Sequence, residues 1–357
     1  MKTFYCKSCN HVLLFNSHIC ESCGATVAFD RERLEMVPLR LGSDSNQWFD
    51  PRGMVRRICG NHKFAVCNWL VEKHEKENLC LSCRFNRYVP ASNDGQSRKQ
   101  WYQLQDAKHR LIYSLLRADL PLVTKLEDQQ IGLAFDFIDE NHPTPFDATA
   151  TTGHSGGRIT INAKEAGSVQ REIAKNSLGE GYRTLIGHFR HEVGHYYWEI
   201  LISNDETKKS QFRNIFGDER SDYQAALQQH YLSPNPNWQS SYISSYASCH
   251  PWEDWAETWA HYFHIVDTAD TAFDFGISLA PRNRALKNLR LKAKFDPYKY
   301  KKFKNIISVF HAMVFATNSL NRSMGLPDLY PFVITPPVRE KLNFVHDLIR
   351  DKKRRAK

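Results

Sequence analysis

The cysteines of this chain are gathered near its beginning. Eight of the nine lie within the first 83 of 357 residues, and Cys249 is the single one beyond. Met1-Lys-Thr-Phe-Tyr-Cys6 leads straight into this cluster without an apolar leader, so we expect a cytoplasmic protein with reduced thiols. In that setting Cys-x-x-Cys pairs favour metal binding over disulfides. The N-terminal part is therefore predicted to fold around metal ions.

The first cluster consists of two such pairs, Cys6-Lys-Ser-Cys9 and Cys20-Glu-Ser-Cys23. Each pair forms a turn that brings two thiolates to one ion, and two pairs complete a tetrahedral four-thiolate zinc site. Residues 1–29 are too few to build a hydrophobic core, so metal binding would supply their folding energy. We predict a zinc ribbon here. His11 and His18 are alternative ligands, but four cysteines in register favour an all-cysteine site.

The second cluster comprises Cys59, Cys67, Cys80 and Cys83, of which only the last two have the Cys-x-x-Cys spacing. We interpret residues 30–97 as a second zinc-binding module that uses these four thiolates. His62 and His74 are rival ligands, and buried free thiols are the alternative without metal. Both cysteine sites are predicted to be structural.

A different metal motif lies in the second half of the chain, His191-Glu192-Val193-Gly194-His195. On a helix, a spacing of four places both histidines on one face, with the glutamate beside them. This spacing is typical of zinc hydrolases, in which the histidines hold the ion and Glu192 takes a proton from the attacking water. The alternatives are a surface helix with incidental histidines, a polar seam, or a different metal site on the stripe of His188, His191, His195 and Glu199. The apolar flanks favour a buried catalytic zinc, because unpaired histidines are costly there.

Two histidines leave a zinc ion short of a third protein ligand, and two glutamates compete for this role. Glu219 follows His195 by 24 residues and Glu253 follows it by 58. Glu253 and Glu257 share one face of a helix rich in tryptophan. Among these tryptophans, that face is a poor candidate for a solvated surface. In this pair, Glu253 suits the role of a metal ligand. Glu257 suits the role of a carboxylate that orients a histidine. Asp222 is a second candidate for orienting a histidine.

The remaining pattern predicts an α+β fold. Residues 89–98 are polar and rich in turn formers, so we place a domain boundary there and a mainly helical, zincin-like metallopeptidase domain at residues 98–357. Residues 101–118 have helical periodicity, whereas residues 131–138 and 156–162 are typical of strands in a small sheet. Such a strand either offers its edge to extended substrate or is an ordinary member of the sheet.

The metal motif and the later helix resemble the glutamate-zincin peptidases related to anthrax lethal factor and to the bacterial Pro-Pro endopeptidases. Those enzymes follow HExxH with a helix of the form ExxxE, and the resemblance implies that Glu253 binds zinc and that Tyr246 stabilises the oxyanion. His230, His250 and His261 are other candidates for that donor. Over nearly its whole length, the chain is similar to the bacterial zinc-binding metallopeptidases with an N-terminal zinc-ribbon region. The resemblance is carried by residues 189–198 and 250–261.

These features together predict a zinc metallopeptidase acting on peptides or proteins, with one catalytic and two structural zinc ions. No apolar run is long enough for a membrane span. The net charge of +9 is uneven: residues 241–357 carry 19 Lys and Arg against 11 Asp and Glu. The basic region from Arg282 to Lys304 and the cysteine modules indicate an alternative, a nucleic-acid or protein-binding protein whose protease-like domain acts on bound proteins or is inactive.

Overall fold

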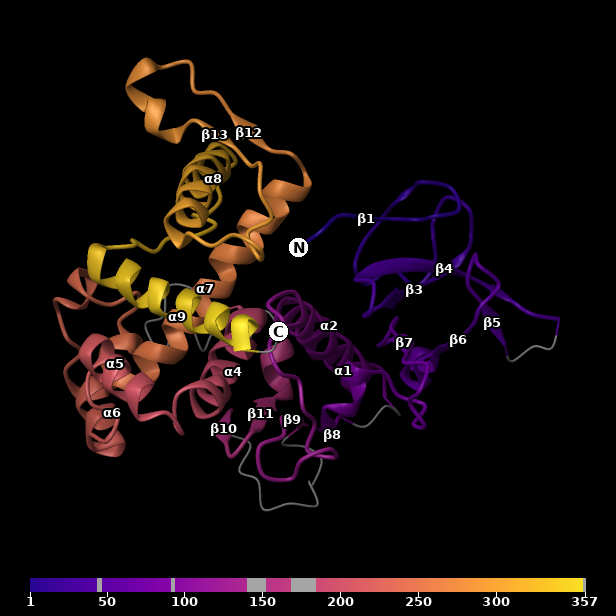
Figure 1. The fold of residues 1–357 in the computed structure, drawn as a ribbon, viewed down its shortest axis with the longest axis horizontal. Helices are drawn as coiled ribbons and strands as arrows, with labels where there is room; N and C mark the ends of the chain where they lie inside the picture. Colours follow the sequence, from indigo (N-terminus) through magenta and orange to yellow (C-terminus); the bar gives the residue numbers. More distant parts are fainter. Residues whose placement is uncertain (44–46, 91–93, 140–151, 168–183, 356–357) are drawn as a thin grey trace. The chain divides into compact units, whose positions relative to one another are not determined.

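The computed structural model describes residues 1–43, 47–90, 94–139, 152–167 and 184–355. The chain divides into two compact units: unit 1 comprises Met1–Lys2 and Glu172–Lys357, and unit 2 comprises Thr3–Arg171. Small sheets dominate unit 2 and long helices dominate unit 1 (Figure 1), which confirms the predicted α+β class. The domain boundaries inferred from sequence stay a prediction.

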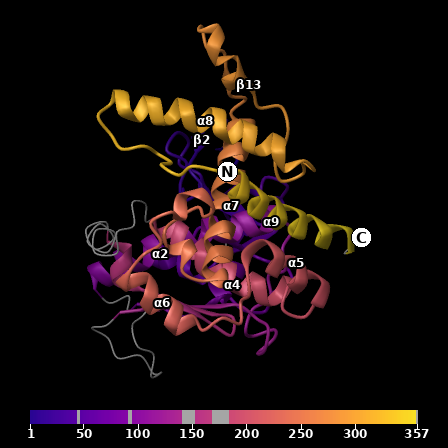
Figure 2. The same ribbon diagram turned by 90° about the vertical axis from the view of Figure 1, so that its left-hand side faces the viewer.

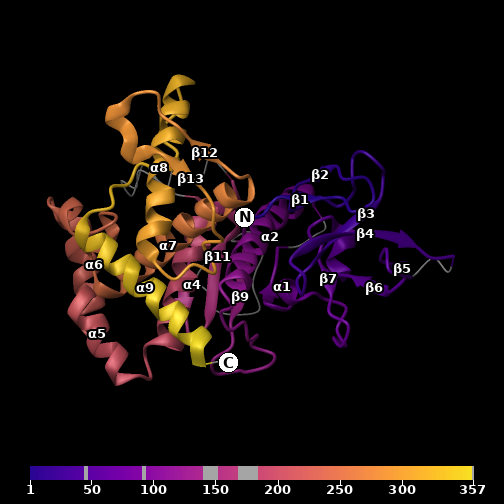
Figure 3. The same cartoon turned by 45° about the horizontal axis from the view of Figure 1, so that its top comes forward.

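Unit 2 begins with a two-stranded ribbon, β1 (Phe4–Tyr5) and β2 (Val12–Leu13), and continues into an antiparallel five-stranded sheet (Figure 3). The order of this sheet is β3 (Thr26–Asp30), β4 (Glu35–Leu41), β5 (Trp48–Phe49), β6 (Val55–Ile58) and β7 (Leu70–Val71). Phe29 also pairs with Trp69, which brings the first strand beside the last. No pattern in the sequence predicts this sheet.

A second sheet has the order β10 (Gly153–Ser155), β11 (Arg158–Asn162), β9 (Ala134–Ile138) and β8 (Asn86–Tyr88). The two predicted strands correspond to β9 and β11, and each of them is paired on both sides. The idea that either strand offers a free edge to substrate is therefore wrong, because their backbone donors and acceptors already serve neighbouring strands.

Helix α2 (Gly95–Arg117) packs within unit 2, together with the short α1 (Leu81–Arg84). Its side chain Tyr113 lies edge-on to Phe15 from the first cysteine segment, with ring centroids 5.4 Å apart, and to Phe29 of β3 at 6.0 Å. Phe29 in turn contacts Trp69 at 4.7 Å. Segments that are far apart in sequence therefore share one aromatic core, which compensates for the small size of each.

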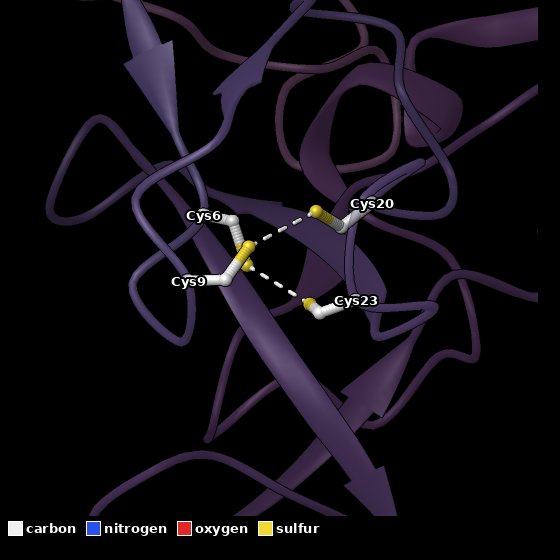
Figure 4. Close-up of side chains that lie close together, drawn as sticks. All are labelled: Cys6, Cys9, Cys20 and Cys23. Carbon is white, nitrogen blue, oxygen red and sulfur yellow. Dashed lines mark hydrogen bonds between the residues drawn. The ribbon is translucent and has the colours of Figure 1, made fainter.

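The first cysteine cluster has the geometry of a four-thiolate site (Figure 4). Cys6 Sγ lies 3.7 Å from Cys23 Sγ, and Cys9 Sγ lies 3.6 Å from Cys20 Sγ. Sulfurs held about 2.3 Å from a tetrahedral zinc are roughly 3.8 Å apart, so these distances fit the ion. Cys6 and Cys20 are buried, whereas Cys9 and Cys23 are exposed.

The second cluster is buried throughout: Cys59, Cys67, Cys80 and Cys83 are each at most 1% exposed. Cys67 Sγ and Cys80 Sγ are 3.7 Å apart, again the separation expected around zinc. Of the rival ligands, His74 is exposed, and His62 Nδ1 instead lies 3.2 Å from the carbonyl oxygen of Cys67.

Side chains of α2 place polar groups and one buried ammonium beside the second cluster. Gln105 Nε2 lies 3.6 Å from Cys83 Sγ, and His109 Nε2 lies 3.6 Å from Cys67 Sγ. Lys108, which lies between these two residues in the sequence, is fully buried. Its ammonium group donates to the carbonyl oxygen of Ser82 at 2.7 Å. Burial lowers the pKa of Lys108 to about 8, although the cysteines oppose this shift. Its ammonium group therefore offsets part of the charge of a four-thiolate zinc site.

Unit 1 is built from helices around α7 (Pro251–Asp274), which packs against α4, α8 and α9 (Figure 2). The elements in chain order are α4 (Leu185–Leu201), α5 (Glu206–Phe216), α6 (Tyr223–Leu232), α7, β12 (Ser278–Leu279), β13 (Leu291–Lys292), α8 (Phe303–Ser323) and α9 (Pro336–Arg355). Lys341 of α9 pairs with the buried Asp254 of α7, with Nζ and Oδ2 2.6 Å apart.

Helices α4 and α7 cross closely at Gly194. A Cβ atom at this position would lie 3.0 Å from the Cα of Ala256 and 3.2 Å from the Cβ of Trp259, so any larger residue would push the helices apart. Trp255 Nε1 donates to the Gly194 carbonyl oxygen at 2.8 Å, and the Tyr197 ring stacks on Trp259 at 4.9 Å. This crossing brings the HExxH motif against the first turns of α7.

We predict that Cys80→Ser removes about one zinc ion per chain and lowers the free energy of unfolding by about 3–5 kcal/mol, because the metal no longer contributes to folding and the buried Lys108 loses the thiolate charge that offsets its burial. Metal analysis and chemical denaturation measure both effects. Cys249→Ser is the matched control and should leave the zinc content unchanged. An unaltered zinc content in Cys80→Ser would rule out metal at this cluster.

Candidate active site

Helix α4 presents the two histidines of the HExxH motif. The helix begins after Thr184, whose hydroxyl accepts from the Gly187 N–H at 3.1 Å. His191 and His195 follow one turn apart, both buried, with ring centroids 5.0 Å apart. Their Nε2 atoms are directed to one carboxylate oxygen, Oε2 of Glu253, at 3.0 and 3.6 Å.

Glu253 comes from the first turn of α7, where the helix dipole favours a carboxylate. It is 2% exposed, and among the described residues Oε2 has no hydrogen-bond partner of standard geometry. Ligand atoms about 2.0–2.1 Å from a tetrahedral zinc lie roughly 3.3–3.4 Å apart, close to the two observed distances. Two imidazole nitrogens and a buried, otherwise unpartnered oxygen therefore fit a zinc ion.

Glu192, the predicted general base, lies beside this group on α4. The side chain is 6% exposed, and Oε1 lies 3.4 Å from His188 Nε2. Burial alone would raise the pKa of Glu192, but the interaction with His188 and the charges of the other two histidines lower it below its usual value. The carboxylate is thus held in its ionised, proton-accepting form.

Glu257 orients His191 from one turn further along α7. Its Oε1 lies 2.8 Å from His191 Nδ1, and its Oε2 accepts from the Ser244 hydroxyl at 2.6 Å. Burial alone would raise the pKa of Glu257, but the hydrogen bond with His191 lowers it to about 2. An ionised Glu257 keeps the proton of His191 on Nδ1 and leaves Nε2 free to bind metal.

Two tyrosines border the site. Tyr246, the predicted oxyanion donor, lies on the turn Tyr246–Ser248, and its ring centroid is 5.9 Å from that of His191. The second is Tyr223, which no motif in the sequence marks. Its hydroxyl donates to Glu253 Oε1 at 2.9 Å. Burial and the charge of Glu253 raise the pKa of both phenols.

Other predicted participants lie elsewhere. Glu219 forms an ion pair with Arg213, with Oε2 2.9 Å from Nε. Asp222, predicted to orient a histidine, instead accepts from the Ala225 N–H at 3.0 Å and caps α6. This correction has a simple reason, because an aspartate just before a helix satisfies its free N–H groups.

The alternative oxyanion donors also have other partners. His250 caps α7 by accepting from the Trp252 N–H at 3.1 Å, and its other nitrogen lies 3.1 Å from the Ser221 carbonyl oxygen. His261 lies 2.8 Å from the Tyr330 hydroxyl. His230 remains near Tyr246, with ring centroids 5.9 Å apart.

None of the described helices combines the length and apolarity that crossing a membrane requires.

Comparison with known proteins gives matches over both parts of the chain. Residues 97–348 match a family described as "Putative zinc-binding metallo-peptidase", and residues 3–94 match a "zinc-ribbon domain". Relatives from Mycobacterium bovis and two Mycobacterium tuberculosis strains are each 37% identical over 350 residues, covering 98% of this chain and 95% of the relative. Each relative is named only as an uncharacterized protein. No solved structure matches the chain.

The family match confirms the resemblance drawn from residues 189–198 and 250–261. The matched segment contains His191, His195 and Glu253, whose ligand atoms lie close enough together to hold a metal ion, and the chain belongs to this family of zinc-binding metallopeptidases and carries an N-terminal zinc-ribbon domain.

Proposed function

We propose that the protein hydrolyses peptide bonds with a zinc ion held by His191, His195 and Glu253. The observation that supports this most is the convergence of their three ligand atoms within 4.8 Å of one another, in a buried site. Glu257 adds support, since a carboxylate on the far nitrogen of a histidine ligand is the usual arrangement around catalytic zinc. Two further zinc ions, held by the cysteine clusters, would be structural.

The chain's own residues divide the remaining work. Zinc, when bound, supplies a Lewis acid that lowers the pKa of water to about 7. Glu192 accepts the proton from the attacking water and returns it to the departing amine. Tyr246 donates a hydrogen bond to the carbonyl oxygen as negative charge develops there. His188 keeps Glu192 ionised before the proton is transferred.

Replacing Glu192 by Gln should preserve zinc binding and lower kcat/KM by about 10³-fold, because the amide cannot accept a proton. Metal analysis, paired with digestion of an unbiased peptide library, measures the two quantities on the same protein. Wild-type protein that holds zinc and cleaves no peptide, or a Glu192→Gln variant with full activity, would contradict the proposal.

The third ligand has its own test. We expect Glu253→Ala to weaken the catalytic zinc by at least about 100-fold and to lower the zinc content by one ion per chain. Glu219→Ala is the matched control, because it removes a carboxylate that pairs with Arg213 and should leave the zinc content intact. Loss of zinc from Glu219→Ala, with normal content in Glu253→Ala, would reverse the assignment.

A second candidate function, nucleic-acid binding, is favoured by unpaired charge in the basic arm, which we define as residues 282–304. The arm contains ten Lys and Arg residues and one acidic residue, Asp296. Within the part of the chain that the structure describes, Lys299 is the one arm cation with an ion pair, at 3.8 Å from Asp296. By contrast, Arg213 and Arg322 elsewhere in unit 1 each pair with a carboxylate.

The aromatic side chains of the arm do not offer a platform for bases. Tyr298 and Phe303 are buried, and Phe295 stacks on Tyr300 with ring centroids 3.9 Å apart. Binding by the arm would therefore rest on phosphate contacts and be independent of sequence.

We expect binding to a DNA duplex that weakens steeply with salt. Replacing Arg282, Arg284 and Lys287 by Ala should lower the slope of log K against log salt by about 3, at roughly 0.9 per phosphate contact. Fluorescence anisotropy over a salt series measures this, and Arg322→Ala is a control outside the arm. Absence of binding at low salt would remove the second function.

A further inference from the structure

We propose that Tyr223 is a positioning residue that holds one oxygen of Glu253 so that the other is presented to the metal. This proposal rests on the assignment of Glu253 as a zinc ligand. It concerns how the ligand set is prepared, and it adds a residue that no sequence motif marks.

The two oxygens of Glu253 have different surroundings. Oε1 accepts a hydrogen bond from the Tyr223 hydroxyl at 2.9 Å. Oε2 faces the imidazole nitrogens of His191 and His195 and has no hydrogen-bond partner of standard geometry among the described residues. The terminal torsion of a glutamate is broad, so the side chain alone does not select this orientation. The Tyr223 phenol therefore selects this orientation of the Glu253 carboxylate. It favours metal binding through a single oxygen, Oε2.

The position of the phenol is itself fixed by the start of α7. The Tyr223 ring lies edge-on to His250, with centroids 5.3 Å apart, and to Trp252 at 6.4 Å. His250 is the residue that caps α7, and its second nitrogen lies 3.1 Å from the carbonyl oxygen of Ser221, two residues before Tyr223. The hydroxyl and the carboxylate are thus tied to the same helix end.

The test replaces Tyr223 by Phe in the full chain. Competition with a chelator then measures the Kd of the most weakly bound zinc ion. We expect its Kd to rise by about 10–100-fold, as for loss of a hydrogen-bond partner of a metal ligand. Tyr231→Phe, a change at an exposed tyrosine of the same helix, is the matched control and should keep the wild-type Kd.

A merely structural role for Tyr223 is separated by a second measurement. Thermal unfolding is compared after chelation that empties only the weakest site, and the Tyr223→Phe variant should then match Tyr231→Phe. A wild-type Kd in Tyr223→Phe would overturn the proposal. So would a loss of thermal stability in Tyr223→Phe that is equally large when the weakest site has been emptied of metal. Weakened zinc in a protein whose wild type cleaves no peptide would support Tyr223 as a positioning residue and contradict the peptidase function.

Discussion

The close crossing of α4 and α7 at Gly194 is the constraint on which the candidate site depends. The histidines belong to α4, whereas Glu253 and Glu257 belong to α7, so the donor set exists only if the two backbones approach closely. Glycine inside a helix normally weakens it, by roughly 1 kcal/mol relative to alanine. Here the missing Cβ lets Ala256 and Trp259 pack directly on the HExxH turn. The stacked Tyr197 and Trp259 rings and the indole of Trp255 then fix the crossing.

Much of this site is encoded locally and was accessible from the sequence. The helix, its two histidines and Glu192 follow from one spacing of four residues, and the pairing of Glu253 with Glu257 follows from another. The spacing of the thiols likewise predicts both cysteine clusters. The sequence favours Glu253 over Glu219 as the third ligand but does not decide between them, because the choice depends on which helix reaches the histidines. The structure turns Glu219 toward Arg213 and Glu253 toward the imidazoles.

Other features depend on contacts that no short pattern contains. Tyr223 and Ser244 each contribute one hydroxyl, and neither sits at a diagnostic distance from HExxH. The sequence does not distinguish the two roles of Asp222, because an acidic residue just before a helix is equally suited to capping it, as Asp222 does for α6. The five-stranded sheet of unit 2 was missed since three of its strands have only two to four residues. Its strands share a hydrophobic cluster of Ala28, Val37, Leu39 and Leu70, against which Trp48 and Ile58 pack, and local periodicity does not reveal this cluster.

The buried pair of Asp254 and Lys341 has a consequence for the order in which the protein is made. Asp254 directly follows Glu253 in the first turn of α7, and its partner lies on α9, which the ribosome produces much later. Until α9 emerges, this turn carries two neighbouring carboxylates without that cation, and burying them is unfavourable. Docking of the last helix therefore completes the environment of the ligand helix. The first turn of α7 therefore gains its buried counter-charge only once the chain has been made as far as residue 341.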